Sequence, residues 1–263
     1  MHFLIKKVLI IKAKYQSYIL RMVCVTLKQA ALGSNQLLNC LTFNNRTQFT
    51  DYCELVNLNL NEVMGNPGDK IAYVYFPVEG IISWEKKIAD SPYLVISLIG
   101  NEGMLCISLM LGQEITPCRS VVQKPGYALR ISAVDFKQQM QHIPTLDTLL
   151  KRYAYVTYAQ LLQATACNLF HVLEKRLARL LLMFQDKTQS SQLHITQELL
   201  AQMLGVRRVA VTKAAGSLQR KKLISYSRGE LIIQDSAGLK AASCSCLQVD
   251  QDIYEKVIVK CNA

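Results

Sequence analysis

The sequence has few histidines and lacks the common catalytic motifs. Only four histidines occur in 263 residues, and none lies between residues 55 and 131, where short alternating runs predict strands. This excludes a histidine-rich metal centre inside a small β-barrel. The chain also has no P-loop, no HExxH pair and no GxSxG elbow. We therefore predict no catalytic residue, no metal ligand and no enzyme activity.

Long apolar runs are also missing, although 51% of the residues are hydrophobic. Lysines at positions 6, 7, 12 and 14 interrupt the most apolar N-terminal stretch, which is too short to cross a membrane. The same stretch has no small-residue cleavage site of a secretory signal. We predict a cytoplasmic protein without a membrane partner. Residues 1–34 are interpreted as a flexible extension or as the result of a start codon placed upstream of Met22.

The nine cysteines are scattered and odd in number, which favours reduced thiols over a disulfide framework. Cys244 and Cys246 form the only close pair. One intervening residue is short for ordinary zinc ligation, and no second pair lies nearby in the sequence. His171 follows Cys167 by four residues on a predicted helix, and we interpret it as a packed core histidine, with a metal ion shared with Cys167 as the alternative. The role of Cys244 and Cys246 stays open.

Charge is distributed unevenly along the chain, whose net charge is +11. Residues 51–150 contain seven basic and eleven acidic side chains, a net −4. Residues 151–240 contain fourteen basic and five acidic side chains, a net +9. A basic segment beside an acidic one is typical of a module that binds a polyanion.

The basic segment contains a helix-turn-helix pattern between Leu193 and Leu223. Thr196 is predicted to cap the first helix, and Gly205 to end it, because glycine tolerates the positive φ after a helix. The second helix is predicted to bury Val211, Ala214, Ala215 and Leu218 and to expose arginines and a lysine. A helix of this kind fits the major groove of DNA. A surface helix pair in an ordinary helical bundle is the alternative.

The remaining chain predicts an α+β protein of several parts. Short alternating strands between residues 55 and 131, with predicted breaks or turns that include Pro77–Gly80 and Lys124-Pro125-Gly126, indicate a small, jelly-roll-like β-barrel. A helix without proline or glycine follows Pro144 and has two stripes. One stripe is predicted to pack on the barrel and the other on a second copy. The first stripe is Leu146, Leu149, Tyr153, Val156, Gln160 and Gln163, and the second is Leu150, Ala154, Leu161 and Ala164. After the helix-turn-helix, two strands turn at Arg228-Gly229, the position of a wing. The predicted parts are an extension (1–34), a barrel (35–142), a dimerisation helix (143–167), a winged helix-turn-helix (168–246) and a C-terminal tail (247–263).

In this order and in the segments ACNLFHVLEKRLARLLLMFQD and LHITQELLAQMLGVRRVAVTKAAGSLQRKKL, the chain resembles the Crp/Fnr superfamily of bacterial transcription regulators. The resemblance places Arg208, Val209 and Lys213 at base-reading positions and Arg207 and Thr196 at phosphate contacts. Val209 replaces the usual acidic residue, and its apolar side chain is suited to a thymine methyl group rather than a cytosine amine. The full predicted DNA-binding set is Thr196, Gln197, Arg207, Arg208, Val209, Thr212, Lys213, Arg220, Arg228 and Gly229.

The sensory half matches less well. Cyclic-nucleotide-binding members of the superfamily use a Gly-Glu followed closely by an Arg-Ser or Arg-Thr pair. Here Glu102 is separated from Arg119 and Ser120 by an apolar stretch. An arginine that pairs with a carboxylate of the barrel is the alternative for Arg119. Cys24, Cys40 and Cys53 are too widely spaced for the iron–sulfur cluster of oxygen-sensing members. We predict no cofactor, with a cyclic nucleotide as the alternative.

These observations predict a homodimeric, sequence-specific transcription regulator that binds double-stranded DNA and RNA polymerase and whose barrel controls the placement of the recognition helices. The alternative is a small-molecule-binding or metal-dependent barrel protein without DNA function.

Overall fold

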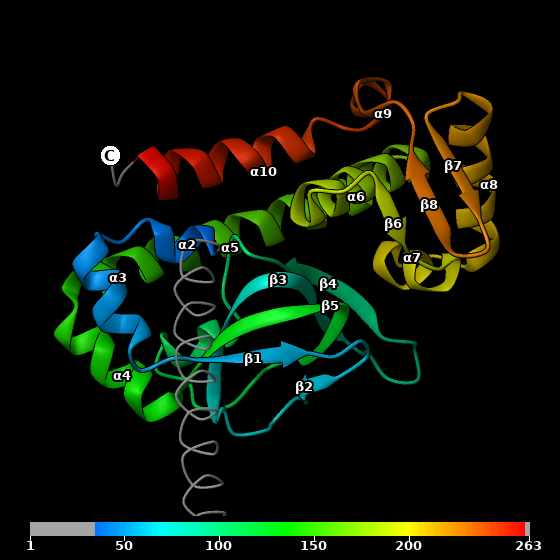
Figure 1. Cartoon of the computed structure of the whole chain (residues 1–263). Coiled ribbons are helices and arrows are strands. Elements are labelled where there is room, and N and C mark those ends of the chain that lie inside the picture. Colours follow the sequence, from blue (N-terminus) through cyan, green and yellow to red (C-terminus); the bar gives the residue numbers. More distant parts are fainter. Residues whose placement is uncertain (1–34, 261–263) are drawn as a thin grey trace, which may run out of the picture.

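The computed structural model describes residues 35–260 (Figure 1). Residues 1–34, which include Cys24, and Cys261 lie outside the described residues. The interpretation of residues 1–34 as an extension therefore stays a prediction. Within the described chain the mixed α+β fold is confirmed. An N-terminal sheet domain, a long central helix, a C-terminal helix-turn-helix domain and a last helix follow one another along the chain.

The sheet domain begins with helices α2 (Gln36–Asn39) and α3 (Phe43–Thr50) and ends with α4 (Ala133–His142). Between them lie β1 (Glu54–Leu58), β2 (Val63–Gly65), β3 (Tyr73–Lys86), β4 (Leu94–Ile99), the 3₁₀ turn η1 (Ile107–Leu109) and β5 (Arg119–Ser132). The strands pair antiparallel in the order β1-β5-β3-β4, and β2 also pairs with β5. This sheet curls around an apolar core (Figure 1).

Two predicted turns are bends within long strands. Pro77–Gly80 lies inside β3 and Pro125-Gly126 lies inside β5, where the register of the two strands shifts. Gly80 has φ +99°, and a Cβ there would lie 2.7 Å from the Lys124 carbonyl oxygen. A Cβ on Gly126 would lie 2.3 Å from the Glu79 carbonyl oxygen. The two glycines thus let the backbones of β3 and β5 approach closely where both strands bend, as β-bulges do.

The central helix α5 (Pro144–Phe170) starts with proline in its first turn, where no backbone donor is needed. Leu146, Leu149, Tyr153 and Val156 are buried against the sheet domain, as one predicted stripe required. In the second predicted stripe, Leu150 is buried in the same core and Leu161 and Ala164 face a cavity within the chain. A different row on α5 is exposed to solvent, namely Tyr155, Tyr158, Leu162 and Leu169.

The C-terminal domain is built on α6 (Leu173–Thr188), α7 (Gln197–Leu204) and α8 (Arg208–Arg220), with a three-stranded sheet. Its strands are β6 (Gln192–His194), β7 (Ile224–Ser227) and β8 (Glu230–Ile233), in the order β6-β8-β7. Strand β6 was not predicted, because three residues are too few for a pattern. The helix α9 (Ser236–Ala242) follows the sheet.

Beyond the predicted winged domain the chain forms α10 (Cys246–Tyr254) and a π-helical turn η2 (Glu255–Val259). Figure 1 shows α10 running back along α6 and α5 towards the sheet domain. Ile258 is fully buried in the core shared by the sheet domain and α5. The stretch predicted only as a tail is therefore a helix that contacts both domains. Among residues 35–260, no helix is both long and apolar enough to cross a membrane.

Candidate DNA-binding interface

Helix α7 begins and ends as its local sequence predicts. The Thr196 hydroxyl accepts a hydrogen bond from the Leu199 backbone N–H at 3.1 Å, which satisfies one free donor of the first turn. Gly205 has φ +64° and directs the chain into α8. The buried face of α7, formed by Leu200, Met203 and Leu204, packs into the core of the C-terminal domain. These contacts fix the angle at which α8 leaves the domain.

Helix α8 buries one face and exposes the other. Val211, Ala214, Ala215 and Leu218 are buried, as predicted from their helical spacing. Arg207, at the N-cap, and Arg208, Thr212 and Lys213 are exposed, and Val209 is 66% exposed. The cations therefore lie on the solvent side of the helix, at its N-terminal end. In helix-turn-helix proteins this end contacts base edges.

The wing lies next to the start of α8. Arg228 and Gly229 have φ of +50° and +87°, as both central residues of a type I′ hairpin turn require. The Tyr226 hydroxyl donates a hydrogen bond to the Ile195 carbonyl oxygen at 2.7 Å, which ties the wing to the residue before the Thr196 cap. The Thr212 hydroxyl donates to Gln197 Oε1 at 2.8 Å and thereby connects α8 to α7.

Five of the ten predicted DNA-binding residues line one hollow between α7, α8 and the wing: Thr196, Gln197, Arg208, Arg228 and Gly229. Arg207, Val209, Thr212 and Lys213 are on the first turns of α8, adjacent to it. Arg220 ends α8, about 18 Å away along a helix with a rise of 1.5 Å per residue. Tyr226 and Ser227 also line the hollow. The sequence did not indicate them, because its pattern predicts only that they belong to a strand.

The three predicted sensory residues do not form one site. Arg119 donates to Glu85 Oε2 at 2.6 Å, and its guanidinium lies 4.8 Å from the centre of the Tyr93 ring. This is the alternative considered for Arg119, and it neutralises a carboxylate that is 4% exposed. Ser120 lines a cavity of about 140 Å³ in the sheet domain, whereas Glu102 lines another cavity, between the domains.

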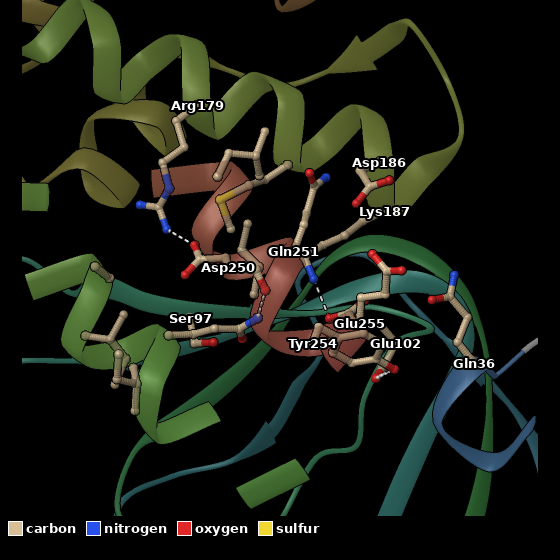
Figure 2. Close-up of a pocket in the computed structure, with 17 residues that line it drawn as sticks. Gln36, Ser97, Glu102, Arg179, Asp186, Lys187, Asp250, Gln251, Tyr254 and Glu255 are labelled. Atoms are coloured by element: carbon tan, nitrogen blue, oxygen red, sulfur yellow. Dashed lines mark hydrogen bonds and ion pairs between the residues drawn. The ribbon is translucent and has the colours of Figure 1, made fainter. Parts of the chain in front are cut away.

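The cavity between the domains has a volume of about 330 Å³ and is lined by β4, α5, α6 and α10 (Figure 2). Two ion pairs cross it: Lys187 with Glu102, and Arg179 with Asp250 (Figure 2). Burial raises the pKa of Asp250, although Arg179 opposes the rise. Asp250 Oδ1 and Arg179 Nε are buried without a hydrogen-bond partner among the described residues. Buried polar atoms of this kind usually have partners, so these two are available to a ligand.

A second group of side chains was also missed. The structure brings Cys167, His171, Cys244 and Cys246 together at the end of α5, with their potential ligand atoms within 4.8 Å of one another. His171 is half-buried at the C-cap of α5 and not packed inside a core, so that interpretation was wrong. The signal was weak in the sequence because 72 residues separate His171 from Cys244.

The exposed basic helix, its scaffold and the adjacent wing define a winged helix-turn-helix protein of the DNA-binding class. A family model described as the Crp-like helix-turn-helix domain matches residues 175–242. No curated protein matches the sequence.

Solved structures of several regulators are similar over most of the chain. A Crp/Fnr-family transcriptional regulator from Eubacterium rectale has a TM-score of 0.62 at 18% identity, over 79% of this chain and 97% of that one. A c-di-GMP-responsive global regulator of Xanthomonas campestris has a TM-score of 0.59 at 17% identity, over 73% and 99%. A Crp-family regulator from Thermus thermophilus has a TM-score of 0.60 at 15% identity, over 72% and 96%.

Residues 175–242 are thus a Crp-like helix-turn-helix domain, and the described chain has the fold of the Crp/Fnr regulators. The Crp-like helix-turn-helix expected from the sequence is confirmed for residues 175–242, and over the rest of the chain the likeness to Crp/Fnr regulators is one of fold.

Proposed function

We propose that this protein is a homodimeric, sequence-specific transcription regulator that reads the major groove with the N-terminal turns of α8. The observation that carries the proposal is the exposed row of Arg207, Arg208 and Lys213 beside the wing. Arginine recognises guanine edges with two hydrogen bonds, and a wing arginine reaches phosphate or the minor groove. In this proposal the protein acts by binding DNA.

The exposed row on α5 supports a dimer. Tyr155, Tyr158, Leu162 and Leu169 follow each other at intervals of three, four and seven residues, which places them on one face of the helix. Each is more than half exposed, from 53% for Leu162 to 77% for Leu169. Apolar side chains aligned in this way on a 27-residue helix favour packing against the same helix of a second copy. Two copies would then present two recognition helices to one DNA duplex.

The cavity between the domains is the place where we propose that an effector acts. It is lined from both domains, so a molecule bound there would have different contacts when the domains move relative to each other. Such a difference in contacts is what shifts a population between two conformations. A cyclic nucleotide bound through Glu102, Arg119 and Ser120 together is not part of the proposal, because those residues line different sites. Contact with RNA polymerase stays a prediction of the sequence.

The test is selection of bound sequences from a random duplex pool by the full-length protein, followed by titration of the enriched duplex at several salt concentrations. We expect a two-fold symmetric consensus with half-sites about 10 base pairs apart. The logarithm of affinity should fall with the logarithm of salt concentration, by about 0.9 for each phosphate contact. A pool without enrichment, together with binding that does not depend on salt, would overturn the proposal.

A further inference from the structure

Three thiols and one imidazole converge from two distant segments of the chain. Cys167 lies in the last turn of α5 and His171 is the C-cap of that helix. Cys244 lies between α9 and α10, and Cys246 is the first residue of α10. Cys167 Sγ is 3.6 Å from Cys244 Sγ, and Cys246 Sγ is 3.4 Å from His171 Nδ1. All four potential ligand atoms lie within 4.8 Å of one another.

Two of these separations match the edges of a tetrahedral metal site. With a Zn–S bond of about 2.3 Å and a Zn–N bond of about 2.05 Å, tetrahedral geometry gives edges of about 3.8 Å between two sulfurs and about 3.6 Å between sulfur and nitrogen. The Cys167–Cys244 pair at 3.6 Å and the Cys246–His171 pair at 3.4 Å are within a few tenths of an ångström of these values. The separation of Cys167 and Cys244 is well beyond the 2.05 Å of a disulfide bond.

The donor set selects the kind of ion. Thiolate sulfur and imidazole nitrogen suit zinc, whereas magnesium and calcium prefer oxygen ligands. Four protein ligands fill a tetrahedral ion completely, as in structural Cys₃His zinc sites, and leave no position for a substrate. The space is small for an iron–sulfur cluster, because that would insert several iron and sulfide atoms between ligands that lie within 4.8 Å of one another.

The surroundings suit a negatively charged zinc–thiolate group. The three cysteines are between 1% and 6% exposed. Three thiolates and one divalent cation carry a net charge of −1, and Arg176 and Arg179 lie close enough to interact electrostatically with Cys167 and Cys244. Nε of each arginine is buried without a hydrogen-bond partner among the described residues. Arg179 is already paired with Asp250, and a buried anionic centre beside Arg176 would offset the charge of Arg176.

Two further features favour an occupied site. Gln163 Nε2 donates to Cys246 Sγ at 3.1 Å, the type of contact that orients a metal ligand from outside the first coordination sphere. His171 is half-buried, so the otherwise enclosed group has a side open to solvent through which an ion can enter. Cys167 and His171, four residues apart, point to the same side because residues at i and i+4 share a face of a helix.

We propose that Cys167, His171, Cys244 and Cys246 bind one Zn²⁺ ion that fastens the joint between the two domains. Two ligands lie at the C-terminal end of α5, directly before the break from which the chain continues into α6 and the helix-turn-helix domain. The other two flank the start of α10, which returns to α5. The ion would hold these three helices in a fixed relation and set the direction in which α6 leaves α5.

The first experiment measures metal in the full-length protein, purified under reducing conditions without a chelator or a metal-affinity tag. We expect one zinc per chain. After removal of zinc, Co²⁺ should bind one per chain and give the intense visible bands of tetrahedral cobalt together with near-ultraviolet sulfur-to-cobalt charge transfer. A 100-fold excess of zinc over its dissociation constant should raise the Tm of the apoprotein by about 5–10 °C.

Variants identify the ligands. We expect His171→Asn and Cys246→Ser to lose stoichiometric zinc and to weaken or shift the cobalt bands. Gln163→Leu should retain the site with affinity lowered by about 10- to 100-fold. Cys118→Ser is the matched control, because Cys118 is equally buried but belongs to the sheet domain. Circular dichroism verifies that each variant is folded, and the cobalt spectrum of the unaltered protein tests the site even if a variant fails to fold.

Three results would overturn the proposal. The first is unaltered protein that contains no zinc and gives no tetrahedral cobalt spectrum. The second is folded His171→Asn and Cys246→Ser proteins that bind zinc as tightly as the Cys118→Ser control. The third is a reduced preparation that binds no metal but forms a Cys167–Cys244 disulfide on mild oxidation, in which the two thiols give up two protons and the oxidant takes two electrons. Because the readouts are metal content and spectra, the outcome is independent of whether the protein binds DNA.

Discussion

Arg208 is the residue on which the proposed DNA recognition depends most directly. Its side chain is exposed at the first position of α8 and lines the hollow shared with the wing. We expect Arg208→Ala to weaken binding to the selected operator by about 1–3 kcal/mol and to relax the preference at one base pair of each half-site. Fluorescence anisotropy with the operator and with single-base variants measures both effects.

The matched control is Lys70→Ala, which also removes one positive charge but from the sheet domain, where the Lys70 side chain is 80% exposed. It should leave the base preference unchanged. If Arg208→Ala and Lys70→Ala bind the operator and its variants equally well, α8 does not enter the groove in the way described.

A substitution at Val209 is expected to change which base pair the protein prefers, rather than to weaken DNA binding in general. The side chain is 66% exposed and its methyl groups can contact a thymine methyl, but they cannot accept a hydrogen bond. We expect Val209→Glu to move the preference at one base pair of each half-site towards C·G, because a carboxylate accepts from the cytosine amine. Repeated selection with the variant checks this, with Val209→Ala as a control that removes the methyl contact and adds no acceptor. An unchanged consensus for Val209→Glu would place Val209 away from the bases.

Much of the local structure of the candidate DNA-binding site could be predicted at the scale of single residues, because its signals are local. The Thr196 cap, the Gly205 turn and the Arg228-Gly229 hairpin each depend on backbone preferences within a few residues. The Cys₃His group could not be predicted in the same way. Its halves are joined by folding of the whole C-terminal domain, and neither half resembles a metal site alone.

At the scale of elements, the strands differ from the sequence-based prediction for a definite physical reason. Glycine and proline normally mark turns, so Pro77–Gly80 and Pro125-Gly126 were predicted to end strands. In the sheet, the two glycines lie opposite each other and permit a backbone approach that any Cβ would block. A sequence pattern indicates the local backbone conformations that a segment can adopt. The close approach of the two glycines depends instead on the pairing of β3 with β5, which the pattern does not contain.

The exposed face of α5 is the element that a dimer requires. Leu162 is 53% exposed in the centre of the row that begins at Tyr155. We expect Leu162→Glu to weaken self-association by at least about 30-fold, because a charge in a helix–helix seam costs 2 kcal/mol or more. Sedimentation equilibrium over a range of protein concentrations measures the association constant. In operator binding, we expect the variant to bind the two half-sites as separate monomers, each more weakly than the dimer binds the whole operator.

Val134→Glu provides the control for this experiment. It also replaces an exposed apolar residue with an acid on a helix, and Val134 is 66% exposed on α4, outside the row. It should leave the association constant unchanged. If Leu162→Glu also leaves it unchanged, the partner does not pack against this face of α5.

At the scale of the whole molecule, α10 and the turn before η1 link the sheet domain to the helix-turn-helix domain. Lys187 on α6 pairs with Glu102, and the Tyr254 hydroxyl at the end of α10 donates to the Glu102 carbonyl oxygen at 2.8 Å. The Leu94 side chain of β4 lies against Gly205, so α7 also packs on the sheet domain. Sequence patterns predicted both halves but not this joint, because each contact pairs residues that are far apart in the chain.

The contribution of the Glu102–Lys187 ion pair to the stability of the contact between the two domains can be measured. The side chains are only 22% and 12% exposed, so removing one charge leaves the other poorly solvated. We expect Glu102→Gln to lower the free energy of unfolding by about 1–3 kcal/mol, although a glutamine oxygen can still accept from the Gly100 N–H as Glu102 does.

Chemical denaturation of Glu102→Gln, Lys187→Met and the double variant tests this expectation, and the double variant should be destabilised by less than the sum of the two single changes. Glu114→Gln is the control, because Glu114 pairs with Lys70 and Lys137 on an exposed surface and should cost less than about 1 kcal/mol. Equal losses for Glu102→Gln and Glu114→Gln would mean that the domains are not held together by this pair. A larger loss for Glu102→Gln, accompanied by altered operator affinity, would connect the position of the sheet domain to that of the recognition helix.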